Sequence, residues 1–260
     1  MSANLVRLGS LVLLLLAATS ACSRDRGAPG GVTATPAGHT YISTQVDGPP
    51  IPGGGPLTLT FTTDRVTANA GCNTHSGSAT FDGDVLRVSG VASTLIGCPG
   101  ELQGSDEWIT GLLQSAPTWK LDGSTLTLRG NNVTVTLLDK KVAQPDKPLT
   151  GTNWMVTELI SSEARIRSQT IDEVKPTLTI TPDGAVSGSA GCNRLIGTAK
   201  IDGAEIAFQV GTTKMLCPPE VMEVEQSVLK ALDGKVTATV DADVLTLRNP
   251  NGNGLVLHAI

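Results

Sequence analysis

The sequence is poor in aromatic and charged residues. Aromatic side chains make up 3% of its 260 residues and charged side chains 17%, and the formal net charge is −5. A weakly acidic chain that has neither a basic stripe nor a set of stacking aromatics is a poor nucleic-acid binder, so we expect no nucleic-acid partner. Long charged helical runs are also missing, whereas glycine is frequent. This composition is typical of a β-rich, turn-rich protein.

Sequence patterns of common catalytic and cofactor sites are missing as well. The chain contains no Gly-x-Ser-x-Gly, no P-loop and no dinucleotide-binding fingerprint. It also lacks the Cys-x-x-Cys pairs that zinc sites and dithiol redox sites use. A nucleophilic Cys72–His75 pair is the remaining alternative, although no third group is evident beside it. We therefore expect no cofactor and no bound metal, and we predict that the protein is not an enzyme.

The first residues have the pattern of a secretory signal. A single positive residue, Arg7, precedes an apolar run from Leu8 to Ala18 that is too short to span a bilayer. The run leads to Thr-Ser-Ala-Cys, which resembles a bacterial lipobox. We therefore predict a lipoprotein signal peptide at residues 1–21 and acylation, for example with palmitate, at Cys22. Ordinary secretory cleavage beside an unrelated cysteine is the alternative.

The cysteine count and the next segment fit a lipid anchor. The chain has five cysteines, and an odd cysteine in an exported protein needs an explanation. Acylation of Cys22 supplies one and leaves four. Residues 22–37 are rich in glycine, proline, alanine and threonine without an apolar period, which predicts a flexible tether. We expect a protein that is lipid-anchored at the extracytoplasmic face of the cell membrane.

The rest of the chain is an internal repeat. Ala-Gly-Cys-Asn occurs at residues 70–73 and again, 120 residues later, at 190–193. Cys-Pro follows at 98–99 and at 217–218, an offset of 119. Because ordered matches extend over both halves, we predict a duplicated domain. The predicted parts are a first domain at 38–138, a linker at 139–148 and a second domain at 149–260.

Each half is predicted to be mostly β-strand. Pro-Leu-Thr-Leu-Thr-Phe at 56–61 and Pro-Thr-Leu-Thr-Ile at 176–180 alternate apolar residues with threonine, as half-buried strands do. Asp82-Gly83 and Asp202-Gly203 stand between short apolar runs and indicate hairpins. The predicted fold class is α+β and β-rich, with two similar domains. Each domain is expected to be a curved or partly closed antiparallel sheet with one short helix.

The single helix of each half is placed directly after Cys-Pro. In the second half, an apolar stripe runs from Val221 to Leu232 at spacings of three and four, and Asp-Gly follows it. In the first half, Leu102, Ile109 and Leu112 or Leu113 form the corresponding stripe, which Gly104 and Gly111 weaken. The acidic residues of the second helix are interpreted as a solvated face. These are Glu220, Glu223 and Glu225.

The second half closely resembles the META domain of the HslJ family. The matching residues are Gly191-Cys192-Asn193, Gly197, Asp202-Gly203, Thr213, Met215 and Cys217-Pro218. The first half fits the pattern more loosely: Leu95 and Ile96 precede Gly97-Cys98, and Tyr41 replaces the usual tryptophan. The resemblance implies a small β-rich domain found in bacterial envelope lipoproteins and associated with stress or antibiotic tolerance. It supplies no catalytic residues.

The four remaining cysteines allow three pairings. Duplication favours Cys72 with Cys98 and Cys192 with Cys217, because each copy must have been able to fold alone. Each bond would stabilise its domain by roughly 3.5 kcal/mol in the chain-entropy model. A metal or redox role is the alternative.

The residues beside the cysteines suit such a structural staple. A glycine before the first cysteine allows an unusual turn, and an asparagine after it can hydrogen-bond the loop. A proline after the second cysteine suits a helix start. These residues are Gly71, Asn73 and Pro99 in the first half and Gly191, Asn193 and Pro218 in the second.

Two classes of function remain open. The first is a non-catalytic, membrane-tethered envelope module that binds an envelope protein or an apolar ligand. The second is an envelope enzyme whose site is assembled between the two domains, and facing carboxylates or a His–acid pair there would favour it. A purely structural spacer is a third, minor interpretation.

Overall fold

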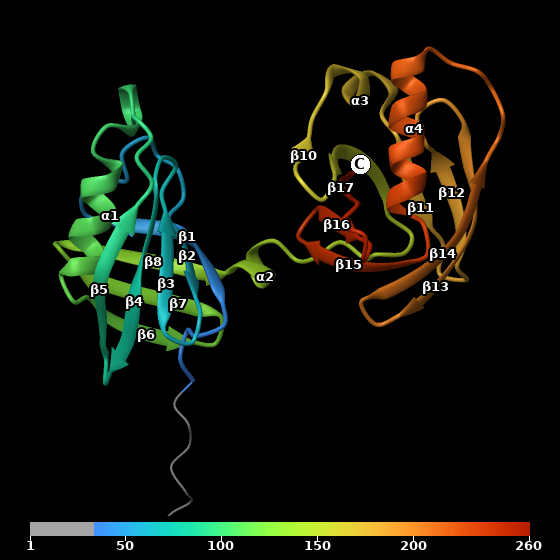
Figure 1. Cartoon of the computed structure of the whole chain (residues 1–260). Coiled ribbons are helices and arrows are strands. Elements are labelled where there is room, and N and C mark those ends of the chain that lie inside the picture. Colours follow the sequence, from blue (N-terminus) through green and yellow to red (C-terminus); the bar gives the residue numbers. More distant parts are fainter. Residues whose placement is uncertain (1–33) are drawn as a thin grey trace, which may run out of the picture. The chain divides into compact units, whose positions relative to one another are not determined.

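Both halves of the chain fold as closed antiparallel sheets, which Figure 1 shows in a computed structural model. The structure describes residues 34–260. The predicted signal peptide, Cys22 and residues 22–33 of the predicted tether lie outside the described residues.

The first domain is an eight-stranded barrel in which each strand pairs with the next along the chain and β8 pairs with β1. The alternation of apolar and polar residues along its strands places one face of each strand in the barrel interior. Its elements are β1 (Thr40–Asp47), β2 (Thr58–Phe61), β3 (Arg65–Asn69), β4 (Thr74–Asp82), β5 (Val85–Ser93), η1 (Gly100–Leu102), α1 (Ser105–Gln114), β6 (Thr118–Asp122), β7 (Thr125–Gly130) and β8 (Val133–Asp139).

The second domain repeats this arrangement. Its sheet closes through β9 and β17, and the two-residue strand β10 pairs with the end of β9. Its elements are β9 (Asn153–Ile160), β10 (Arg165–Ile166), α3 (Gln169–Val174), β11 (Thr177–Ile180), β12 (Ala185–Ser189), β13 (Arg194–Asp202), β14 (Glu205–Thr212), α4 (Pro219–Ala231), β15 (Lys235–Asp241), β16 (Val244–Arg248) and β17 (Gly254–Ala259). Helix α2 (Lys140–Ala143) lies in the segment that joins the domains.

The two predicted Asp-Gly hairpins are confirmed. Asp82 pairs with Val85 and Asp202 pairs with Glu205, so each loop has two residues. The first loop residue is Gly83 or Gly203, and each has a φ of +59°. Glycine with positive φ at this position is the pattern of the tight turns that match the twist of paired strands.

The helices differ from the sequence prediction in number and in one boundary. One helix per half is wrong for the second domain, because it contains α3 beside α4; Ser168 caps α3 by accepting a hydrogen bond from the Ile171 N–H. In the first domain, Leu102 lies in η1, and α1 begins at Ser105 because Gly104 adopts a φ of +89° at its N-cap. No helix in the part of the chain described here is long and apolar enough to cross a membrane.

Each domain has its own hydrophobic core. The first core is built around Tyr41, Phe61 and the buried side of α1, and the second around Trp154, Phe208 and the buried side of α4. Tyr41 and Trp154 occupy matching positions near the start of β1 and β9, and both are almost completely buried. The tyrosine therefore fills the place of the tryptophan, and no residue belongs to both cores.

Separate cores predict that the domains fold independently. A fragment of residues 149–260 should unfold in a single cooperative transition, because it contains every residue of its core. Far-ultraviolet circular dichroism and calorimetry of the fragment and the full chain would measure this. A fragment without a cooperative transition, beside a full chain that has one, would contradict the prediction.

Candidate functional site

One disulfide bond lies inside each domain, at the place where the repeat is most similar. Cys72 is bonded to Cys98 and Cys192 to Cys217, with Cα–Cα distances of 5.9 and 6.0 Å. Each bond joins the turn before β4 or β13 to the segment that enters the helical region after β5 or β14. The segments at 94–98 and 213–217 are called the clamped loops below.

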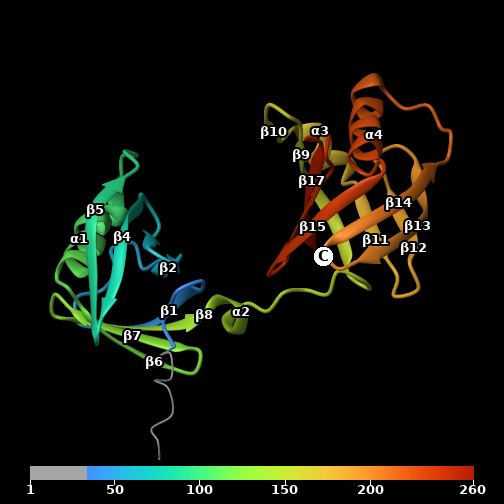
Figure 2. The same ribbon diagram turned by 60° about the horizontal axis from the view of Figure 1, so that its bottom comes forward.

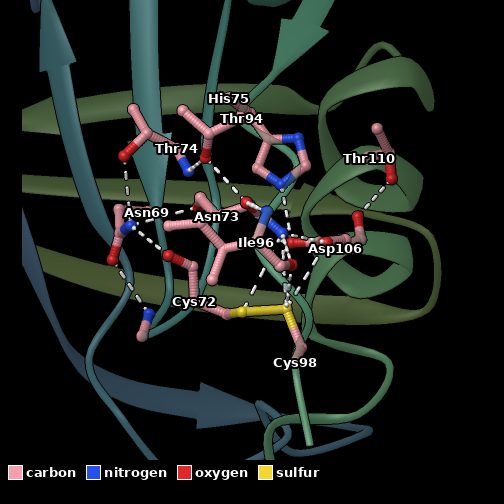
Figure 3. A network of polar contacts seen from close by, with 11 residues as sticks. Asn69, Cys72, Asn73, Thr74, His75, Thr94, Ile96, Cys98, Asp106 and Thr110 are labelled. Carbon is pink, nitrogen blue, oxygen red and sulfur yellow. Dashed lines mark hydrogen bonds and ion pairs between the residues drawn. A yellow bond between two sulfur atoms is a disulfide. The ribbon is translucent and has the colours of Figure 1, made fainter.

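The asparagine after the first cysteine holds the clamped loop of the first domain (Figure 3). The Asn73 side-chain Oδ1 accepts hydrogen bonds from the Ile96 N–H at 2.8 Å and from the Thr94 hydroxyl at 2.7 Å. Its Nδ2 donates to the Ile96 carbonyl at 2.9 Å and to Asp106 Oδ2 at 2.8 Å. The amide therefore pairs with both backbone groups of Ile96, as a neighbouring β-strand would.

The second domain repeats these contacts. Asn193 Oδ1 accepts from the Met215 N–H at 2.6 Å and from the Thr213 hydroxyl at 2.9 Å, and Nδ2 donates to the Met215 carbonyl at 3.1 Å. The acid is now Glu225 of α4, which accepts from Asn193 Nδ2 at 3.1 Å and from the Asn193 backbone N–H at 2.8 Å. Both asparagines are 2% exposed, so their polar atoms depend on these partners.

The interpretation of Glu225 as part of a solvated helix face is wrong. Its side chain is buried, whereas Glu220 and Glu223 are exposed. Asp106 and Glu225 stand at the repeat offset of 119, the same offset that aligns the second cysteines. This alignment narrows the candidates, because Glu223 matches Gly104, but it also pairs Glu220 with Glu101 and so does not single out the buried acid.

The glycines and prolines beside the cysteines have the backbone roles that such residues favour. Gly71 and Gly191 have φ values of +104° and +120°, a region that side chains other than glycine rarely adopt. Pro99 and Pro218 stand at the N-caps of η1 and α4. Together these residues turn the chain on both sides of the disulfide bond.

A histidine distinguishes the first domain from the second. His75 is 2% exposed and its Nε2 lies 3.0 Å from Asp106 Oδ1, whereas Leu195 occupies the matching position in the second domain. The Nδ1 atom of His75 has no hydrogen-bond partner among the described residues. Because the Cys72 sulfur is bonded to Cys98, it has no thiolate for a Cys–His pair.

The surroundings of Asp106 favour its charged form. Burial acts to raise the pKa of this carboxyl, but hydrogen bonds from Asn73 and His75 and the charge of His75 outweigh burial and hold the pKa below its ordinary value. An ionised carboxylate is the better acceptor for both donors.

The clamped loops expose large apolar side chains. Leu95 is 96% exposed and Ile96 64%, and in the second domain Met215 is 60% and Leu216 95% exposed. Ile96 and Met215 are also the residues whose backbone the asparagine amide holds. The hydrogen bonds of the asparagine amide thus fix the backbone of each clamped loop, while its large apolar side chains face solvent.

Residues 34–260 contain no group of three or more His, Cys, Asp or Glu side chains that could hold a metal ion.

A model of the META domain matches the chain twice, at residues 34–142 and at 147–259. The chain belongs to the META domain family. The two copies in this META protein account for almost all of the described residues. A comparison with curated proteins found no significant match.

Solved structures similar to one part of this META protein include two from bacteria. A protein from Burkholderia xenovorans, solved by NMR, is 23% identical over 43% of this chain and 83% of its own, with a TM-score of 0.38. A DUF4847 family protein from Bacteroides vulgatus is 15% identical over 42% of this chain and 93% of its own, with a TM-score of 0.33.

The hydrogen bonds of the Asn193 side chain predict that a nearly isosteric substitution strongly destabilises the second domain. Asn193→Asp replaces two N–H donors with an oxygen that faces the Glu225 carboxylate and the Met215 carbonyl. We expect a loss of about 2–4 kcal/mol in the free energy of unfolding of the second domain, because buried acceptors and charges are left opposed. Calorimetry of the full chain would measure it.

The matched control is Asn251→Asp, which makes the same chemical change at an exposed position. If the unfolding temperature of the second domain were equal in the two variants, the role of Asn193 would be contradicted.

The lowered pKa of Asp106 predicts that the stability of the first domain depends on pH in the acidic range. Because its pKa is lowered in the folded protein, the stabilisation is complete above the ordinary carboxyl pKa of about 4 and is lost as pH falls through the lower folded value. Asp106→Asn should remove this part of the acid dependence of first-domain stability. Denaturant unfolding measured between about pH 6 and pH 2 would test it, with the exposed Asp64→Asn as a control that keeps the parent profile.

Proposed function

We propose that this META protein is a non-catalytic, membrane-tethered lipoprotein of the bacterial envelope that binds a protein partner or an apolar ligand through its clamped loops. The observation that carries the proposal is the exposure of Leu95 and Leu216, at 96% and 95%, in the same loop of both domains. Apolar side chains that gather on a surface mark sites of interaction.

The rigidity of the loops supports binding. In each domain the disulfide bond and the asparagine amide fix the backbone two residues apart, at Ile96 and Cys98 or at Met215 and Cys217. A loop that is ordered before it binds loses little conformational entropy on binding. A segment that served only as a spacer would have no need to hold leucine in water.

The tether and the setting rest on the sequence and the family. The lipobox-like segment before Cys22 supports anchoring at the extracytoplasmic face of the membrane. The resemblance to the HslJ family supports a role in envelope stress or antibiotic tolerance. The same anchor would keep the clamped loops close to partners and lipids of the envelope.

Site-specific photo-crosslinking tests the binding role. A benzophenone amino acid placed at Leu95 or Leu216 of the full chain, in cells that export it, should give discrete adducts after irradiation. The matched control is Thr239, which is exposed on β15. Mass spectrometry of the adducts separates an envelope protein from a lipid or another apolar ligand. Equal and diffuse labelling from all three positions would contradict the proposal.

A further inference from the structure

Strand β14 extends beyond its partner β15. The two strands pair only from Glu205 to Ala207, and one further bond joins the Phe208 N–H to the Gly234 carbonyl. On its other side, β14 pairs with β13 without interruption as far as Thr212. The last part of β14 therefore has a free edge in the described structure, next to the loop that leads to α4 (Figure 2).

The pairing pattern identifies the backbone groups on this edge. Backbone N–H and C=O groups of successive strand residues point to opposite sides, and the Phe208 N–H points toward β15. The N–H and C=O groups of Val210 and Thr212 must therefore point the same way, where no strand in residues 34–260 pairs with them. Unpaired groups of this kind are a template for another strand.

A groove lies along the free edge. It has a volume of about 660 Å³, and the end of β14 forms one wall while Leu229, Lys230, Leu232 and Asp233 of the α4 region form the other. The edge sequence Phe-Gln-Val-Gly-Thr contains neither proline nor a charged residue, the devices that commonly protect an edge from pairing. The groove continues to Lys214 and thus to the clamped loop.

We propose that this groove binds an extended peptide segment of a protein partner, which adds to β14 as a further strand; the inference rests on the proposed binding function. The two pairs of backbone groups match an extended backbone, and about five residues would cover Phe208–Thr212. Every second peptide side chain would point to the inner side of the sheet, where Val210 and Leu229 favour an apolar residue.

The charged residues at the groove indicate which peptide segments it would prefer. Two exposed lysines, Lys214 and Lys230, and one exposed acid, Asp233, line the groove, and none of the three forms an ion pair within the described residues, so the lining carries a net positive charge. This charge favours an acidic residue in the bound segment. In the first domain β5 also pairs with β6 at Val85 only, but Leu95 and Gly111 stand at the positions that match Lys214 and Lys230. The inference therefore concerns the charged groove of the second domain.

The test combines peptide selection with one backbone substitution. The full chain selects binders from a displayed library of random nine-residue peptides, and a selected peptide is then synthesised. Val210→Pro removes the N–H that faces the free edge and replaces a side chain that packs against the core, while the N–H groups of Gln209 and Gly211, which face β13, remain. Val210→Thr keeps that N–H and is the matched control. We expect binding to weaken about tenfold or more in the proline variant and little in the threonine variant.

Amide hydrogen exchange separates strand addition from other binding. The bound peptide should slow exchange at Val210 and Thr212, while Gln209 and Gly211 are already protected by β13. The inference is overturned if the selected peptides do not carry an apolar residue at every second position, or if the amides of Val210 and Thr212 stay unprotected. It is also overturned if the proline and threonine variants bind the peptide equally. A dimer of the chain that Val210→Pro dissociates would also overturn it, in favour of self-pairing.

The two proposals fail separately. Loss of discrete adducts from Leu95 and Leu216 counts against the binding function of the clamped loops. Normal adducts from those positions, together with no effect of Val210→Pro, count against strand addition only.

Discussion

The amide group of a single asparagine side chain holds the geometry that the two domains share. Asn73 and Asn193 each use the carbonyl oxygen for two donors and the nitrogen for two acceptors, so that all the hydrogen-bonding capacity of the amide is used. Three separate parts of the chain meet at this group: the turn after the first cysteine, the clamped loop and the helix. The disulfide bond adds a covalent link to an arrangement that the amide already defines.

The sequence predicted the parts that depend on local chemistry or on the repeat. The Asp-Gly hairpins, the alternating strands and the duplication follow from residue types at fixed offsets, and the structure contains them. The two intradomain disulfide bonds also follow from the repeat. The repeat was informative because a residue type that recurs at the same offset in both copies indicates a structural role that both domains share.

The features that sequence reasoning missed depend on tertiary contacts. The repeat aligns both Glu220 and Glu225 with an acid of the first domain, and only the contact with Asn193 distinguishes the buried Glu225. Helix α1 begins later than its apolar pattern suggests because the backbone at Gly104 turns. The free edge of β14 could not be predicted either, since it depends on where β15 leaves the sheet and not on the sequence of β14.

The side-chain amide of Asn73 and the disulfide bond constrain the same loop. Asn73 binds the backbone of Ile96, two residues before Cys98, so its hydrogen bonds and the disulfide bond, with its Cα–Cα distance of 5.9 Å, hold the same stretch of chain. In a chain without the disulfide bond, the same amide hydrogen bonds would favour the approach of the two cysteines. After reduction, the hydrogen bonds of Asn73 and Asn193 would be the contacts that remain to hold the loops carrying Leu95 and Leu216.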